Sequence, residues 1–338
     1  MKNILFIPVG GTICTRLNLD GALSVYNGAG AFIIDNFMNS DSAYRDDVKF
    51  TLADNLMILS ENMNVEKWNH ILDSYRFHKG KYDGVIFAHG TDTLAFSASL
   101  FSMIPTDIPV FFVSSNARLD SDRANGNDNF RCAVECICNN ITPNVYVPYR
   151  NISDGKMLLH LGSRIMQCRN YSEDFESIGA VEIVDRDYDG ALRFFEKFPS
   201  KASYPEVSMN NIRLKDKVIA LFPYVGLNYD AIDFSRFSAV LHGTYHSGTV
   251  CSDSSDNSVF RLLDICKDNV DVYLSPSRAE GEIYESLKFI VERGGVEFLY
   301  GCTFETAYAK LIIAYSVFED KDKIKTYMKT EQNYEFFA

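Results

Sequence analysis

Two threonines that follow short apolar runs are the residues of this chain best suited to covalent chemistry. Thr12 comes shortly after the run 4–9, and Thr91 comes shortly after the run 85–88, with Asp92 next to it. A threonine hydroxyl is a weak nucleophile, so a partner must help to remove its proton before it can attack a carbonyl. A carboxylate beside one of the threonines is a group that such a site can use. We therefore expect both hydroxyls to line one crevice.

The elements around these threonines predict where the crevice lies. Both apolar runs have the length of a buried strand, and residues 94–101 predict a helix directly after the second one. Thr91 and Asp92 are thus expected on a strand-to-helix turn. Ligands bind at the carboxyl ends of the strands in open parallel α/β sheets. The alternative is that Thr91 and Asp92 only cap the following helix.

These two turns resemble a known family. Residues 10–13 (Gly-Gly-Thr-Ile) and 89–93 (His-Gly-Thr-Asp-Thr) are similar to the two signature motifs of the bacterial-type L-asparaginases. The resemblance includes the D subunit of the archaeal glutamyl-tRNA(Gln) amidotransferase. It implies that Thr12 is the first nucleophile, forming an acyl-enzyme at the ligand's side-chain carbonyl, with Thr91 opposite. It also implies that Asp92 holds the ligand's α-ammonium group.

Glycines and small polar residues complete the implied site. Main-chain N–H groups around Gly11 and at Gly90 and Thr91 are the implied donors to the oxyanion. Residues 109–115 predict a third buried strand, and the family has a comparable strand followed by an arginine and an aspartate-rich loop. The resemblance therefore implies that Ser115 and Asn116 line the same crevice.

A further segment is similar to the family's substrate-carboxylate segment. Residues 60–63 (Ser-Glu-Asn-Met) follow a strand-like run at 56–59 and precede a predicted helix for which Asn64 is a good N-cap. The resemblance implies that Ser60 and Glu61 hold the amino-acid end of the ligand. The alternative is that both residues merely end a strand.

Two departures from the family pattern affect the catalytic groups. Residues 14–23 are polar and turn-rich, which predicts a mobile flap, but the family tyrosine is missing there and Tyr26 is the nearest one. The family also has a lysine that pairs with the motif aspartate and helps to deprotonate the second threonine. Its place is taken by Gln167, or by Met166 if a one-residue gap lies elsewhere. Arg169 is close in sequence, but an arginine does not give up its proton.

The resemblance implies an α/β protein with an asparaginase-like two-domain fold. Residues 1–190 are expected to form a larger N-terminal domain on a mainly parallel sheet with helices. Residues 191–214 are expected to be a linker, since they include prolines and many polar residues. Residues 215–338 are expected to form a smaller C-terminal α/β domain.

A histidine in the second domain is a further site residue. His246 follows a predicted strand in a polar turn, and it is expected to face a ligand from the second domain or from a neighbouring subunit. His242 lies four residues earlier, but the intervening Gly243 and the strand-end setting argue against a helical zinc pair. We therefore expect neither a metal nor a cofactor.

Composition excludes several classes of function. The formal charge of −12 argues against nucleic acid as the main partner, and no apolar run approaches the length of a membrane span. The N-terminus enters a core-like strand at once, which argues against a secretory signal. The 8 cysteines are scattered without a Cys-x-x-Cys pair, which favours a reducing compartment. Together these features predict a cytoplasmic protein.

Three functions are compatible with these residues. The first is an asparaginase-type amidohydrolase that cleaves the side-chain amide of asparagine or a related small amide and releases ammonia. The second, which the missing lysine favours, is a catalytically impaired ligand-binding protein with the same pocket. The third is an ammonia-supplying subunit of a tRNA amidotransferase, although the acidic chain offers tRNA no basic surface. The resemblance implies a homodimer or homotetramer.

Overall fold

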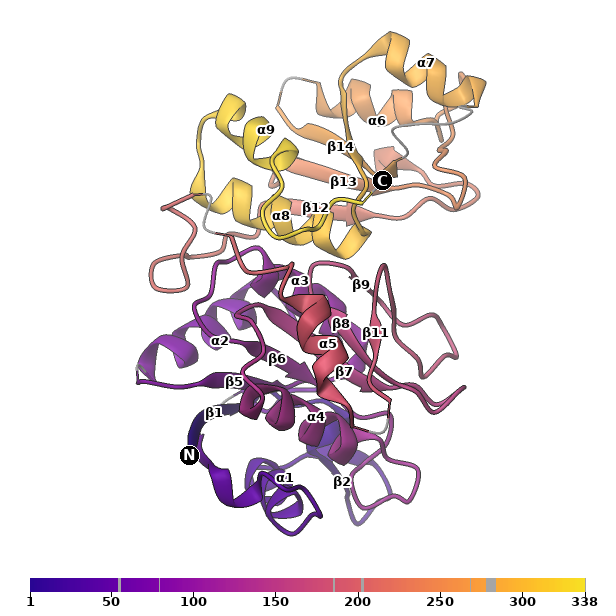
Figure 1. Ribbon diagram of the computed structural model, residues 1–338. Coiled ribbons are helices and arrows are strands. Elements are labelled where there is room, and N and C mark those ends of the chain that lie inside the picture. The colour runs from indigo at the N-terminus through magenta and orange to yellow at the C-terminus, as the bar shows by residue number, and fades with distance from the viewer. Residues whose placement is uncertain are drawn as a thin grey trace. The chain divides into compact units, whose positions relative to one another are not determined.

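The computed structural model describes residues 1–53, 56–78, 80–184, 186–201, 204–267, 269–277 and 284–337. The chain divides into two compact units, Met1–Ile212 and Arg213–Ala338 (Figure 1). The first unit extends beyond residue 190 because Arg76 donates hydrogen bonds to the carbonyls of Met209 and Ile212. Most of the expected linker at 191–214 therefore belongs to the first unit.

A mainly parallel seven-stranded sheet organises the first unit. Its strand order is β11-β8-β7-β6-β5-β1-β4 (Figure 1). The strands are β1 (Lys2–Pro8), β4 (Val48–Leu52), β5 (Gly84–Ala88), β6 (Val110–Val113), β7 (Val145–Arg150), β8 (Met157–Leu161) and β11 (Val181–Glu182). The five strands from β4 to β7 in this order are parallel, whereas β8 and β11 run antiparallel to their neighbours. The expected fold class is confirmed.

Helices and short hairpins complete the first unit. The helices are α1 (Ala29–Met38), α2 (Val65–Phe77), α3 (Leu94–Ser102), α4 (Gly126–Cys138) and α5 (Tyr188–Phe195). Two antiparallel pairs are formed by β2 (Thr15–Leu17) with β3 (Leu23–Val25), and by β9 (Ile165–Met166) with β10 (Glu176–Ser177). Short 3-10 turns occupy Thr12–Cys14, Arg45–Asp47, Ser60–Asn62 and Thr91–Thr93. Every helix in the described ranges is too short or too polar to span a bilayer.

Helices cover both faces of this sheet. Phe6 lies opposite Ile86 in the register of β1 and β5, so Phe6 and Phe87 project to opposite faces. On one face, Phe6 packs edge-on against Phe130 of α4 at 5.1 Å between ring centroids. On the other face, Phe87 packs at 5.1 Å against Phe101 of α3. Both faces are therefore apolar, as a parallel sheet buried between helices requires.

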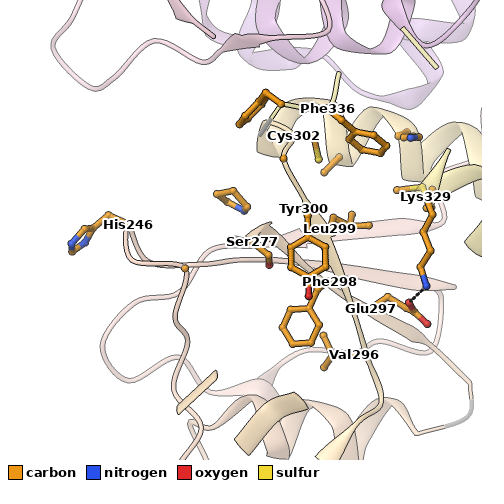
Figure 2. Close-up of a pocket in the computed structure, with 17 residues that line it drawn as sticks. His246, Ser277, Val296, Glu297, Phe298, Leu299, Tyr300, Cys302, Lys329 and Phe336 are labelled. Carbon is orange, nitrogen blue, oxygen red and sulfur yellow. Dashed lines mark ion pairs between the residues drawn. The ribbon is translucent and has the colours of Figure 1, made fainter. Parts of the chain in front are cut away.

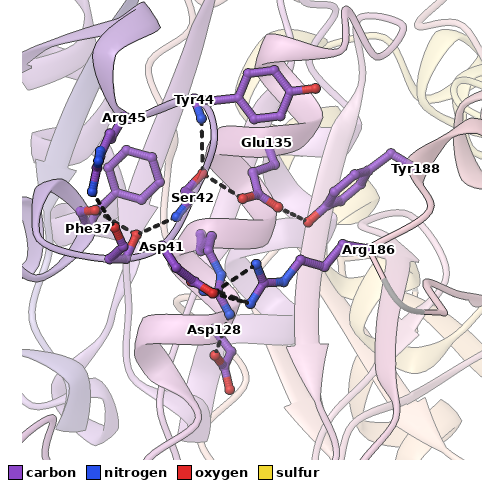
Figure 3. A network of polar contacts seen from close by, with 11 residues as sticks. Phe37, Asp41, Ser42, Tyr44, Arg45, Asp128, Glu135, Arg186 and Tyr188 are labelled. Atoms are coloured by element: carbon purple, nitrogen blue, oxygen red, sulfur yellow. Dashed lines mark hydrogen bonds and ion pairs between the residues drawn. The ribbon is translucent and has the colours of Figure 1, made fainter.

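A buried carboxylate fastens the segment after α1 to α4 and α5 (Figure 3). Glu135 is 3% exposed, and its two oxygens accept hydrogen bonds from Ser42 Oγ at 2.6 Å and Tyr188 Oη at 2.5 Å. At the surface beside it, Arg186 donates to Asp41 at 3.4 Å. Because a buried carboxylate needs donors in place of water, these partners tie three distant segments together.

The second unit is a smaller α/β sheet with helices, as expected. Its four parallel strands lie in the order β12-β13-β14-β15. Its elements are β12 (Val218–Leu221), β13 (Ala239–Gly243), β14 (Asp271–Ser277), β15 (Val296–Tyr300), the 3-10 turn Tyr229–Ala231, α6 (Val259–Cys266), α7 (Glu285–Arg293), α8 (Phe304–Val317) and α9 (Lys321–Lys329). A buried ion pair at 2.7 Å joins Lys310 of α8 to Glu335 of the C-terminal segment.

Two local predictions have different outcomes. The predicted N-cap of α2 is confirmed, because Asn64 Oδ1 accepts a hydrogen bond from the Lys67 N–H at 2.9 Å. The predicted strand at 56–59 is wrong. Met57 has φ 49°, which is not extended backbone, and only a single parallel bridge between Gly10 and Ile58 remains.

Candidate active site

Three segments meet where β1 and β5 end, and glycines allow the contact. Gly11 has φ 76°, and a β-carbon placed on it would collide with the main chain of Gly90. A β-carbon placed on Gly90 would in turn collide with Ser60 Oγ. The turns that carry Thr12, Ser60 and Thr91 are therefore in direct contact.

The Gly11 N–H has an acceptor within the protein. It donates to the carbonyl of Ile58 at 2.8 Å, and this hydrogen bond holds the segment before Ser60 against the first threonine turn. The Gly11 N–H is therefore engaged within the protein. The reason is the close approach of the 58–60 segment, whose carbonyl needs a donor.

The second and third segments are joined by side chains. Ser60 Oγ donates to Asp92 Oδ2 at 2.9 Å, and Thr93 Oγ1 donates to the Ser60 carbonyl at 2.9 Å. Ser60 is 4% exposed, whereas Asp92 and Glu61 are exposed. The alternative that Ser60 only ends a strand does not account for its contact with Asp92.

The helix-cap alternative for the second motif is also wrong. The N-cap residue of α3 is Thr93, and no side chain caps this helix. Thr91 and Asp92 instead form the 3-10 turn before it, and Thr91 is half-buried. Thr12 is likewise half-buried in a 3-10 turn after β1, the strand that pairs in parallel with β5. The two threonines thus occupy equivalent positions on neighbouring strands.

Gln167 and Met166, the two residues predicted in the place of the family lysine, have different contacts. Gln167 Nε2 donates to the main-chain carbonyl of Thr91 at 3.0 Å. Met166 instead lies in β9, opposite Glu176. Arg169 is exposed and pairs with Glu176 at 2.7 Å. The structure therefore places Gln167, a neutral amide, beside the second threonine.

Burial raises the pKa of Cys168 to about 12, and the nearby carboxylates of Asp174 and Asp92 add to this rise. Cys14, in the 3-10 turn of Thr12, has its pKa raised to about 12 by complete burial. Both thiols therefore stay protonated near neutral pH. A protonated thiol is a poor nucleophile, so neither cysteine replaces the threonines.

The loop after β6 uses its polar side chains to hold itself together. Ser115 is fully buried, and its hydroxyl donates to the Ala117 carbonyl at 2.5 Å and accepts from the Gly126 N–H at 3.1 Å. Asn116 exchanges hydrogen bonds with Asn125 and donates to Glu173 Oε2 at 3.2 Å. The structure shows a loop-forming role for Ser115, and Asn116 links this loop to the segment between β9 and β10.

The hairpin of β2 and β3 returns Tyr26 to the first threonine turn. Its N–H donates to the Cys14 carbonyl at 3.2 Å, and its ring centroid lies 4.9 Å from the Arg16 guanidinium. Burial, together with the nearby thiol of Cys14, raises the pKa of Tyr26. Residues 14–23, expected to be a flap, thus include β2 and the turn that leads into β3, and this hairpin brings Tyr26 close to the turn of Thr12.

A large hollow is lined by residues of the second unit alone. It has a volume of about 960 Å³, and Figure 2 shows His246 at its edge with Phe298, Tyr300 and Phe336 among the side chains around it. His246 is exposed and belongs to the second unit. Cavity size therefore does not mark the predicted site, which is identified by the polar contacts of the first unit.

No group of three or more His, Cys, Asp or Glu side chains that could hold a metal ion occurs in the part of the chain that the structure describes.

The model of the asparaginase N-terminal domain matches residues 3–194, more than half of this chain. The chain belongs to the asparaginase family.

Curated relatives of this asparaginase-family chain include amidotransferase subunits. The D subunit of the glutamyl-tRNA(Gln) amidotransferase of Archaeoglobus fulgidus is 28% identical over 249 residues, which are 71% of this chain and 58% of that protein. The D subunit of the same name from Pyrococcus abyssi is 24% identical over 98% of this chain and 76% of its own length. The chain spans 58% and 56% of the first two relatives it matches.

Solved asparaginases share the fold. The thermostable L-asparaginase from Thermococcus kodakarensis matches with a TM-score of 0.75 and 19% identity, over 99% of both chains. A probable cytoplasmic L-asparaginase from Campylobacter jejuni matches with a TM-score of 0.72 and 20% identity, over 98% of this chain and 100% of that one. At these identities the likeness is one of fold.

Proposed function

We propose that this protein hydrolyses the side-chain amide of asparagine or a related small amide and releases ammonia. The observation that carries the proposal is the contact of the Gly11 turn with the Gly90 turn, which brings Thr12 and Thr91 to one place at the sheet edge. Membership of the asparaginase family supports the same chemistry. The exposed Asp92 carboxylate, with Ser60 behind it, supports a site for an amino acid.

Thr12 acts as the nucleophile in this proposal. Its hydroxyl attacks the amide carbon, the C–N bond breaks, and ammonia leaves with the proton taken from the hydroxyl. Water then cleaves the ester on Thr12 and returns its proton to the hydroxyl, so that the free acid leaves. Asp92 binds the ligand's α-ammonium, and Ser60 and Glu61 hold the amino-acid end of the ligand. The N–H groups of Gly90 and Thr91 are the remaining donors for the oxyanion.

A second function is favoured by one contact. Gln167 donates its amide to the Thr91 carbonyl, so a neutral group stands where the family has a cation. A glutamine side chain is a neutral amide that does not gain or lose a proton near neutral pH, so it does not act as a general base. Groups in such a site act as a unit, and loss of one commonly lowers turnover by orders of magnitude. The chain is then a ligand-binding protein with the same pocket and no turnover.

Ammonia release separates the two functions. Purified protein is incubated with asparagine, glutamine and other small amides, and ammonia is measured continuously. Release that is proportional to enzyme concentration supports the hydrolase. Absence of release from every amide, with a rise in melting temperature on adding aspartate, supports the binding protein instead. If no ammonia is released and aspartate does not raise the melting temperature, the proposal that these residues form an amino-acid site is contradicted.

The assembly is also a proposal. A homodimer or homotetramer follows from the asparaginase resemblance, whereas the curated relatives are named as subunits of a larger enzyme. Sedimentation of the purified chain, followed by purification from its native cell, distinguishes a homo-oligomer from a complex with a second chain. We also propose a cytoplasmic location, which the 8 free cysteines support.

A further inference from the structure

A chain of buried hydrogen bonds lies behind the second threonine turn. Trp68 Nε1, from α2, donates to Ser97 Oγ at 2.9 Å. Ser97, from α3, lies 2.9 Å from His89 Nε2, and His89 Nδ1 lies 2.9 Å from the Gly90 carbonyl oxygen. Trp68 is 4% exposed, and Ser97 and His89 are fully buried. The chain therefore connects two helices to the peptide that precedes Thr91, without solvent.

The two ends of this chain fix the position of every proton in it. An indole N–H only donates, and a carbonyl oxygen only accepts. Because the Gly90 carbonyl only accepts, a neutral His89 carries its proton on Nδ1 and donates it to that carbonyl. Its unprotonated Nε2 then accepts from the Ser97 hydroxyl, whose oxygen accepts from Trp68. One tautomer of a neutral imidazole satisfies the whole chain.

Burial keeps the imidazole in that neutral form. It lowers the pKa of His89 to about 4, against smaller opposing effects of the Gly90 carbonyl and the Asp92 carboxylate. A second ring proton on Nε2 would also displace the Ser97 hydroxyl from its acceptor. The arrangement of donors is therefore constant around neutral pH.

The orientation of the next peptide group follows from this bond. A trans peptide is planar, and its carbonyl and N–H point in opposite directions. Since the Gly90 carbonyl points to His89, the N–H of Thr91 points away from His89. A hydrogen bond accepted by a carbonyl also polarises the same amide and strengthens its N–H as a donor. His89 thus sets both the direction and the strength of one donor beside Thr91.

The second unit repeats the same arrangement at a strand end. His242 lies next to Gly243, the last residue of β13, and its Nδ1 lies 2.6 Å from the Gly243 carbonyl oxygen. The hydroxyl of Tyr229 lies 2.9 Å from His242 Nε2, and both residues are buried. Here Tyr245 stands at the position that Asp92 holds in the first turn. The second turn therefore offers an internal control with the same bond but without the carboxylate.

We propose that His89 is a positioning residue, held by Ser97 and Trp68, that aims the Thr91 N–H at the oxyanion of the reacting amide. The proposal rests on the proposed amidohydrolase function. It adds a role for three buried side chains, from the residue after β5, from α2 and from α3, that do not touch the substrate.

The proton arrangement is tested first by NMR, independently of activity. Nitrogen-15 labelling of histidine is expected to show His89 as a neutral ring protonated on Nδ1 from pH 6 to pH 8, values chosen to lie well above the pKa of about 4. The Thr91 amide proton is expected to shift in His89→Leu and to return toward the wild-type position in His89→Asn, whose amide can donate to the Gly90 carbonyl. Protonation on Nε2, or an unchanged Thr91 resonance in His89→Leu, overturns the proposal.

Kinetics then test the consequence for turnover. We expect His89→Leu to lower kcat by about 10- to 100-fold with KM nearly unchanged, and His89→Asn to recover part of the loss. His242→Leu, which removes the equivalent bond in the second unit, is expected to keep kcat. An equal loss in both leucine variants indicates a structural role and overturns the proposal.

Failure of the proposed function gives a different result. If the wild-type protein releases no ammonia from any amide, the proposed hydrolysis is wrong, but the positioning role of His89 is not yet tested. Ligand binding and NMR then test that role. Aspartate affinity should then fall in His89→Leu and not in His242→Leu. Equal affinity in wild type and His89→Leu, with an unshifted Thr91 amide proton, removes the positioning role as well.

Discussion

Ser60 and Asp92 lie 32 positions apart in the chain, and a hydrogen bond of 2.9 Å joins Ser60 Oγ to Asp92 Oδ2. The bond leaves the other oxygen of Asp92 for a ligand and fixes the direction of the carboxylate. It connects the segment proposed to hold one end of an amino acid with the segment proposed to hold its ammonium. The geometry of ligand binding therefore depends on a pair of residues from two different turns.

Removal of this hydroxyl should weaken ligand binding. Ser60→Ala leaves Asp92 without its donor, so we expect KM for the amide to rise about tenfold, equivalent to about 1.4 kcal/mol, with a smaller change in kcat. Steady-state kinetics measure both constants. Ser40→Ala, just after α1, removes a hydroxyl that donates to the Phe37 carbonyl and accepts from the Ser42 N–H, and it should leave KM unchanged. A KM that is equal in both variants contradicts a role for Ser60.

A lysine at position 167 should increase turnover. Gln167→Lys places a cation beside Thr91, where it can pair with Asp92 and assist proton transfer, so we expect kcat to rise by at least about tenfold. Met166→Lys is the matched control, because it adds the same charge one residue earlier, in β9. Turnover numbers under saturating amide measure the effect. An equal gain in both variants would show that charge alone matters and that position 167 is not special.

A methyl group at Gly11 should prevent the turns from meeting. Its β-carbon would collide with Gly90, and its φ of 76° disfavours any side chain, so Gly11→Ala should lower the free energy of unfolding by about 2–4 kcal/mol. Gly21 has a similar φ of 83° with open space around it. Gly21→Ala should therefore lower the free energy of unfolding by only about 1 kcal/mol. Urea unfolding compares the two, and equal losses would contradict a close contact of the turns.

Buried histidines should make the protein less stable as the pH falls below 6.5. Burial lowers the pKa of His89 to about 4 and that of His160 to about 3, from an ordinary value of 6.5. The unfolded chain therefore binds protons between these values that the folded chain does not. Each histidine should lower the free energy of unfolding by about 2 kcal/mol between pH 7 and pH 5.

The variant His160→Asn isolates one of these contributions. It should remove about 2 kcal/mol from the difference between the free energies of unfolding at pH 7 and pH 5, whatever its effect on stability at pH 7. Urea unfolding at both pH values provides the difference. A pH dependence equal to that of the wild-type protein would show that His160 is protonated in the folded state.

Much of the fold could be predicted from local patterns. The apolar runs before Thr12 and Thr91 correspond to β1 and β5, and the run after Thr91 corresponds to α3. These elements are predictable because a buried strand and a helix each produce a hydrophobic pattern among residues that are close in sequence. The N-cap at Asn64 is similarly local. The strand predicted at 56–59 does not form, because Met57 adopts a positive φ that the apolar composition of these residues does not indicate.

The contacts between segments could not be predicted in the same way. The Ser60–Asp92 bond and the use of the Gly11 N–H by Ile58 depend on how distant turns approach each other. Ser97 and Trp68 look like core residues of two helices, and only their shared contact with His89 reveals a polar chain. The apolar run 94–101 contains two serines, Ser97 and Ser99, and the sequence does not indicate which of them contacts His89.

Ammonia release by Thr12→Ala tests the central claim most directly. Because the hydroxyl of Thr12 is the proposed nucleophile, we expect the variant to release ammonia from the preferred amide at least about a thousandfold more slowly than wild type. Thr12→Ser should keep measurable activity, and Thr326→Ala, an exposed threonine of α9, should match wild type. Ammonia release by Thr12→Ala at the wild-type rate would contradict the account.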